Sequence, residues 1–147
     1  MKKIIYIAFA LLVATNCSAQ IESAAKSVFS LTTFKKDGTL LASTHGVFVG
    51  DKGEAISSWK PFVGADSAVV IDANGKQSVV SALIGANELY NVCKFKVDGN
   101  TQPASVATAA SKKGEKVWIL QYSVNKPLID QRNVQSVEPF MEKYAYY

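Results

Sequence analysis

The sequence predicts an all-β protein built as an antiparallel barrel or sandwich. Short runs rich in β-branched and aromatic residues alternate with turn signals, at residues 28–34, 46–49, 68–71, 78–84 and 92–97. The turns between them carry Asp-Gly, Lys-Gly or Asn-Gly dipeptides, whose residues tolerate the positive φ that tight turns need. Short, regularly punctuated strands are typical of barrels and sandwiches, and composition alone does not choose between the two.

The alternation within these strands predicts which side chains form the core. Successive side chains of a strand point to opposite faces of the sheet. A short helix over residues 22–26 is expected ahead of the first strand, and no internal repeat or coiled-coil pattern is visible. The expected core includes Val47, Val69, Ile71, Leu83 and Phe95.

Residues 1–19 have the layout of a secretory signal peptide. Two lysines precede an apolar run over residues 4–14, and small residues lead up to Ala19, which predicts cleavage after that residue. The run is too short to span a membrane comfortably, so we expect an exported protein, periplasmic or extracellular, without a membrane span. A lipoprotein signal with a lipidated Cys17 is the alternative, but Asn16 is larger than the residue that normally precedes such a cysteine.

Signal cleavage changes what the remaining composition implies. The net charge falls from +4 to +2, because Lys2 and Lys3 are removed and no acidic residue is. No polybasic run or basic-aromatic patch remains, so we expect no nucleic-acid partner. Cys93 becomes the only cysteine, which excludes an internal disulfide, and its place in an apolar strand predicts a small core residue rather than a nucleophile or metal ligand.

The chain after the signal divides into three parts. Residues 20–98 contain the predicted strands and are long enough to bury a core. Residues 99–115 are polar, alanine-rich and interrupted by Pro103, which is typical of a linker. Residues 116–147 are again rich in strand formers. The elements expected in this last part are a strand at 116–122, a turn at 125–127 and a partner strand at 132–140.

Four stretches carry a family resemblance: Gly46-Val47-Phe48-Val49, Gly53 to Phe62, Gly64-Ala65-Asp66 and Gly85 to Asp98. Together they resemble the first barrel of trypsin-like serine proteases, nearest the HtrA/Deg branch. The resemblance extends from about residue 27 to residue 140. It implies a trypsin-like antiparallel β-barrel over residues 20–98, followed by an incomplete, truncated second barrel over residues 116–147.

The resemblance also identifies where catalytic residues are expected. In that family the slot after the glycine-headed strand holds the catalytic His, and the slot before the last strand of the barrel holds the catalytic Asp. Here these slots contain Lys60 and Asn91. A charged lysine has three donors and no acceptor, so it acts as a base only when burial removes its charge. A neutral amide cannot stabilise the imidazolium that forms in a Ser-His-Asp triad.

The third triad member has no counterpart in the sequence. In the resembled family the nucleophile lies in a Gly-Asn-Ser-Gly-Gly-like turn of the second barrel, and no such turn occurs before Tyr147. Ser123 and Ser136 lack the flanking glycines that shape an exposed nucleophile and its oxyanion donors. We therefore interpret both as ordinary strand serines, and the sequence contains no intact catalytic set.

The resemblance predicts that Lys60 and Asn91 face each other across one cleft. An amide oxygen is a reasonable acceptor for an ammonium, so a Lys60–Asn91 contact within hydrogen-bonding reach is expected. The alternative is that Lys60 points into solvent and Asn91 caps a turn by itself. His45, the only histidine, precedes the catalytic-His slot and is a possible neighbour of this cleft, although a plain strand position fits it better.

Cofactors and metals are not expected. One histidine and one cysteine of the mature chain do not make a zinc set. The glycines are scattered without a phosphate-cradling motif.

Three functions stay open. The first is an inactive protease homologue that keeps the barrel and binds a protein or peptide. The second is the N-terminal part of a serine endopeptidase with non-standard catalytic residues, in which Lys60 is the base and the nucleophile lies beyond Tyr147. The third is a secreted β-barrel interaction domain unrelated to proteases.

The aromatic segment at residues 116–147 adds an expectation about partners. Unpaired strand edges and exposed aromatic surface favour association. Either the gene product continues past Tyr147, or a second molecule completes the half-barrel and the chain self-associates.

Overall fold

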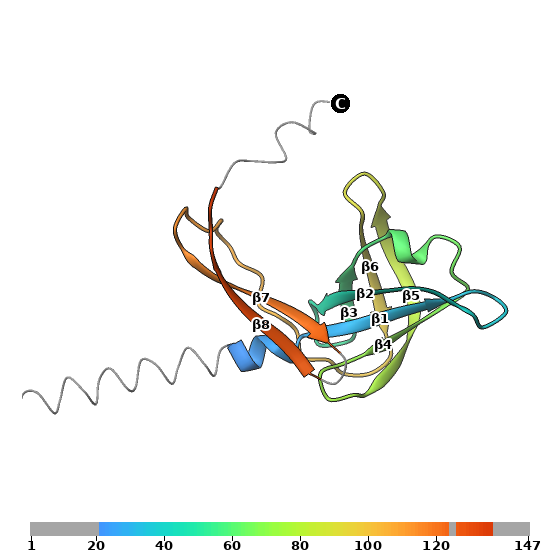
Figure 1. Ribbon diagram of the computed structural model, residues 1–147. Coiled ribbons are helices and arrows are strands. Elements are labelled where there is room, and N and C mark those ends of the chain that lie inside the picture. Colours follow the sequence, from blue (N-terminus) through green and yellow to red (C-terminus); the bar gives the residue numbers. More distant parts are fainter. Residues whose placement is uncertain (1–20, 124–125, 137–147) are drawn as a thin grey trace, which may run out of the picture.

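The computed structural model describes residues 21–123 and 126–136. Its main body is a closed barrel of antiparallel strands in the order β1-β2-β3-β6-β5-β4, with β4 pairing back onto β1 (Figure 1). The signal peptide expected at residues 1–19 lies outside the described residues. The six strands are β1 (Val28–Phe34), β2 (Leu40–Phe48), β3 (Glu54–Ser57), β4 (Ser67–Ile71), β5 (Gln77–Asn87) and β6 (Val92–Val97).

Five of the six barrel strands were predicted, and β3 was not among the expected runs. The expected runs at 28–34 and 92–97 coincide with β1 and β6. β2 begins six residues before the expected run at 46–49 and ends one residue before its end, and β5 extends beyond the expected run at 78–84. Residues 21–25 are helical, as expected within one residue. The closed antiparallel barrel is therefore confirmed, and it resolves the choice between barrel and sandwich. No helix within 21–123 and 126–136 is long and apolar enough to cross a membrane.

The barrel core is built around Phe29 of β1, which is completely buried. Its ring centroid lies 4.6 Å from that of Phe48 and 6.0 Å from that of Phe95. Aromatic rings at these separations pack favourably beyond the area that they bury. β6 contributes alternate residues to the same core, because Cys93, Phe95 and Val97 are all buried.

Most of the expected core residues lie elsewhere. Phe95 is fully buried, but Val47, Val69 and Ile71 are only half-buried, and Leu83 is 47% exposed. For Leu83 the cause is local, because the pairing of β5 with β6 shifts register twice along this strand. A bulge leaves one residue unpaired and changes which face the following side chains occupy.

For the other three residues the phase of the alternation was assigned wrongly. β2 and β4 place Phe48, Ala68 and Val70 inside the barrel instead. Both faces of these strands carry apolar residues, so the period of two identifies a strand without showing which face is buried. Moving the pattern by one residue exchanges the two faces completely.

The segment between β6 and β7 crosses the end of the barrel without regular structure and is tied to it in its first part. The Thr101 hydroxyl donates to the Gly50 carbonyl at 2.6 Å and accepts from the Gly53 amide at 3.1 Å. The Ala104 amide donates to the Phe48 carbonyl at 2.8 Å. Gly53 itself needs its left-handed φ of +91°, and a side chain there would collide with the Val97 carbonyl oxygen.

β7 (Lys116–Ser123) and β8 (Lys126–Asn133) form a separate two-stranded sheet beside the barrel (Figure 1). The expected turn at 125–127 and the expected start of its partner strand at residue 132 are wrong, because Ser123 pairs with Lys126 and the return strand begins there. Residues 137–140 of that expected partner strand lie outside the described residues. Pro127 is therefore a strand residue rather than a turn residue, which is compatible with a strand at the edge of a sheet. The strand expected at 116–122 is confirmed.

Gly46 allows the barrel to close over Phe29. A side-chain carbon at Gly46 would overlap the Phe29 ring and lie 2.6 Å from the Ile56 carbonyl oxygen. Gly85 offers a matched control, because a side-chain carbon there meets no atom within 4 Å.

We expect Gly46→Ala to lower the free energy of unfolding by about 1–3 kcal/mol, the usual effect of overpacking a core. Gly85→Ala should change it by no more than about 0.5 kcal/mol. Urea unfolding followed by tryptophan fluorescence measures both values. Equal stability of the two variants would contradict the packing of Phe29 against Gly46.

Candidate functional site

The candidate site begins at a short 3₁₀ helix, η1 (Lys60–Phe62), that follows β3. The Phe62 amide donates to the Trp59 carbonyl at 2.9 Å, and the Val63 amide donates to the Lys60 carbonyl at 3.1 Å. Pro61 favours this turn, because its fixed φ suits the first helical positions and its missing amide is not needed there. The sequence Trp-Lys-Pro-Phe thus folds locally into one tight turn.

Two aromatic side chains hold this turn against the barrel. The rings of Trp59 and Phe62 stack nearly parallel, 6.5 Å apart with 9° between their planes. The Phe62 ring also packs on buried Phe95, with centroids 5.3 Å apart. Both residues were missed as site residues by the sequence analysis, although an aromatic pair flanking a Lys-Pro dipeptide is a visible signal. Their packing fixes the backbone position of Lys60.

Asn91 forms the other side of the site, at the end of the β5–β6 hairpin. Its φ of 49° makes it the only residue other than glycine with a positive φ in the described parts of the chain. Asparagine adopts this left-handed conformation more readily than most residues. The Asn91 amide donates to the Glu88 carbonyl at 3.1 Å, which closes the turn between the two strands.

The structure brings Lys60 and Asn91 together through the backbone. The Lys60 amide N–H donates to Asn91 Oδ1 at 2.8 Å, and the Trp59 amide donates to the Asn91 carbonyl at 3.3 Å. The expected proximity of the two residues is therefore confirmed. The expected bond is not the one observed, because the amide oxygen accepts from the Lys60 backbone and the Lys60 side chain is exposed.

His45 lies on β2, opposite Ser30 of β1. Its side chain is exposed, and its carbonyl accepts a hydrogen bond from Ser57 Oγ at 2.6 Å. The neighbouring pair of Gly46 and Ser57 joins β2 to β3, three residues before Lys60. His45 is thus at the same end of β3 as η1, in an ordinary strand position.

Cys93 follows Asn91 by two residues and is buried in the barrel wall. Its thiol donates to the Ser58 carbonyl at 3.4 Å. Desolvation by burial raises the pKa of the Cys93 thiol, so the nucleophilic thiolate is disfavoured. These features agree with the interpretation of Cys93 as a small core residue.

The groups that the structure brings together at this site are hydrogen-bonding groups. Asn91 supplies a neutral amide whose oxygen accepts from a backbone N–H, and the Lys60 side chain is exposed. Ser136 follows β8 at an exposed position, while the side chain of Ser123 lies outside the described ones. Within 21–123 and 126–136, no group of three or more His, Cys, Asp or Glu residues could hold a metal ion.

Asn91 contributes in two separable ways, through its amide oxygen and through its tolerance of positive φ. We expect Asn91→Ala to lower the free energy of unfolding by about 1–2 kcal/mol, because it loses the acceptor and strains the backbone. Asn91→Gly loses only the acceptor and should cost about half as much, whereas Asn91→Asp keeps an acceptor and should stay within about 0.5 kcal/mol of the parent. Thermal unfolding monitored by circular dichroism measures this order, and an alanine variant as stable as the parent would contradict it.

Comparison with known proteins identifies the fold. No family model matches the sequence, and no curated protein sequence matches it either. Among solved structures, the chain is similar to the serine endoprotease from Yersinia pestis, with a TM-score of 0.71 and 19% sequence identity. The match covers 80% of this chain and 43% of the endoprotease, so the chain spans less than half the length of that protein. The barrel of this chain therefore has a trypsin-like serine protease fold, as the sequence resemblance implied.

Proposed function

We propose that this chain is an exported, catalytically inactive homologue of trypsin-like serine proteases that acts as a protein- or peptide-binding module. The observation that carries the proposal is the pairing of Lys60 with Asn91. These residues occupy the slots where the resembled family has its catalytic His and Asp, and they are joined by a 2.8 Å bond from a backbone N–H to a side-chain amide. That bond fixes a loop and moves no proton.

The exposure of Lys60 supports inactivity. In the competing function, the N-terminal part of a serine endopeptidase with non-standard catalytic residues, Lys60 would act as the base. A lysine fills that role when burial in an apolar site disfavours its charge. The Lys60 side chain is exposed, so the fold supplies no such burial. The third possibility, an unrelated secreted β-barrel interaction domain, shares the binding role and differs in ancestry.

The β7–β8 sheet supports a role in association. Each strand is paired only with the other within the described residues, and a two-stranded sheet alone is marginally stable in water. Apolar side chains are exposed on both strands, including Trp118, Ile119, Leu128 and Ile129. Strand addition from a partner, or from a second copy of this chain, would cover these side chains and pair the free edges.

We expect the purified chain to show no turnover of casein or peptide substrates and no adduct with serine-directed phosphonates. The physical reason is that its Lys60–Asn91 pair provides no group that accepts a proton from a nucleophile. A quenched fluorescent casein assay and intact-mass spectrometry make the two measurements.

Lys60→Ala and Lys36→Ala, a lysine on the β1–β2 turn, form a matched pair for this experiment. Turnover lost only in Lys60→Ala would overturn the proposal and establish the lysine-base alternative. Turnover kept in both variants would also overturn inactivity and would remove the lysine-base alternative.

Export by the signal peptide can be tested separately. When the whole chain is produced in a Gram-negative bacterium, we expect it in the periplasmic fraction or the medium with Gln20 as its N-terminal residue, because small residues up to Ala19 suit a signal peptidase. Ala19→Phe should block this cleavage. A chain that keeps Met1 would contradict export by this signal, and an N-terminal acylated Cys17 would establish the lipoprotein alternative.

A further inference from the structure

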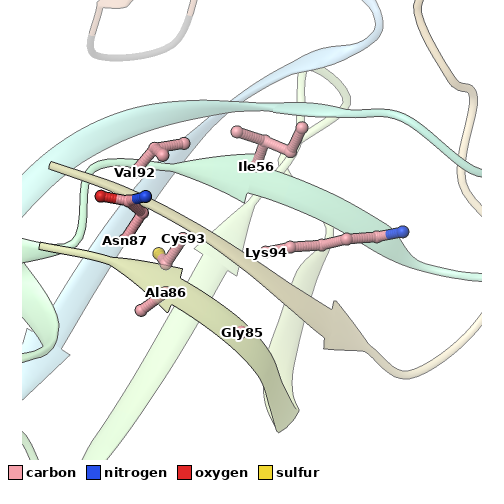
Figure 2. A pocket seen from close by; sticks show the side chains of 7 residues that line it. All are labelled: Ile56, Gly85, Ala86, Asn87, Val92, Cys93 and Lys94. Carbon is pink, nitrogen blue, oxygen red and sulfur yellow. The ribbon is translucent and has the colours of Figure 1, made fainter. Parts of the chain in front are cut away.

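A shallow pocket of about 220 Å³ lies over β3, β5 and β6 (Figure 2). Its apolar lining includes Ile56 of β3 and Val92 of β6, and Gly85 of β5 forms part of it. A side-chain carbon at Gly85 would meet no atom within 4 Å, so the space that a larger residue would fill is open. The pocket exists partly because this position is a glycine.

One lysine lies in this lining, whose other polar side chain is the neutral amide of Asn87. Lys94 of β6 is exposed and is paired in register with Ile56 on one side and with Gly85 on the other. Neither cross-strand neighbour can neutralise it. Lys96, two residues on, differs because its cross-strand neighbour on β3 is Glu54. Within the described ranges Lys94 forms no ion pair, so its charge is available to a ligand.

The surrounding surface extends the apolar character of the pocket. Leu89 and Tyr90 in the β5–β6 turn are 66% and 40% exposed, and Val92 at the start of β6 is 37% exposed. A ligand that complements this surface carries an apolar group for the hollow and an anionic group for the Lys94 ammonium.

We propose that this pocket binds an extended peptide segment that carries an apolar side chain and a carboxylate two residues apart. The apolar side chain occupies the space between Ile56, Val92 and Gly85, and the carboxylate contacts Lys94 Nζ. In an extended chain, side chains two residues apart lie on the same face, separated by roughly 6–7 Å. This spacing allows both groups to reach the surface of one sheet. The inference rests on the proposed binding function and names the ligand that it takes.

The test uses the purified chain and the peptide acetyl-Ser-Leu-Ser-Glu-Ser-amide. We expect saturable amide shifts in ¹H–¹⁵N spectra at Ile56, Gly85 and Val92, with a Kd of about 1 mM or tighter, since one apolar group and one ion pair are engaged. Peptides with lysine in place of glutamate, or serine in place of leucine, should bind about tenfold more weakly or not at all.

Two variants probe the two halves of the pocket. Gly85→Leu fills the hollow from an open position and should weaken binding about tenfold or more, as should Lys94→Glu. Lys94→Glu should also reverse the preference, so that the lysine peptide binds better than the glutamate peptide. Lys36→Glu, a charge reversal on the β1–β2 turn, should leave binding within about twofold. Because Lys94 is exposed, its reversal keeps the test decisive if Gly85→Leu fails to fold.

Each other outcome overturns the inference. Absence of saturable shifts, equal binding of the glutamate and lysine peptides, or binding unchanged by both variants would exclude this site. Shifts at Lys60, Phe62 and Asn91 that survive both variants would place the peptide in the η1 site. That result would overturn this inference while leaving the proposed binding function in place.

Discussion

The structure depends on the packing of Phe29 beneath Gly46. The buried ring of Phe29 contacts Phe48 across the β1–β2 pair and Phe95 across the barrel. Phe95 in turn supports Phe62 of η1, so one aromatic series runs from the barrel centre to the candidate site. A side chain at Gly46 would interrupt this series at its origin. The position of Lys60 is thereby set by core packing rather than by any contact of its own side chain.

The strands were predictable because their signals are local. The β-branched runs and the glycine turns mark β1 and β6 at their observed bounds. The buried face was not predictable, because β2 and β4 carry apolar residues on both faces and the phase depends on which face the closed barrel encloses. The β5 bulges and the return strand at Lys126 were missed for a related reason, since pairing register is decided between strands and not within one.

The candidate site shows the same division between local and non-local information. The resemblance was enough to pair Lys60 with Asn91, because it fixes which loops meet at one end of the barrel. The type of bond was not accessible, since the Asn91 oxygen can accept from an ammonium or from a backbone N–H. The positive φ of Asn91 and the Trp59–Phe62 stack decide in favour of the backbone. Both features arise from the tertiary arrangement of η1 against the hairpin.

Asn91 also connects η1 with the pocket proposed to bind a peptide. Its side chain holds η1 on one side, and its left-handed backbone directs the chain into Val92, which lines the pocket over β3, β5 and β6. A residue selected for proton chemistry must keep its carboxylate available to an imidazole, whereas a residue that only orders two loops needs an acceptor and a tolerated φ. Asparagine meets both of the latter requirements without the charge. The amide at this position therefore orders η1 and the β5–β6 turn without adding a charge.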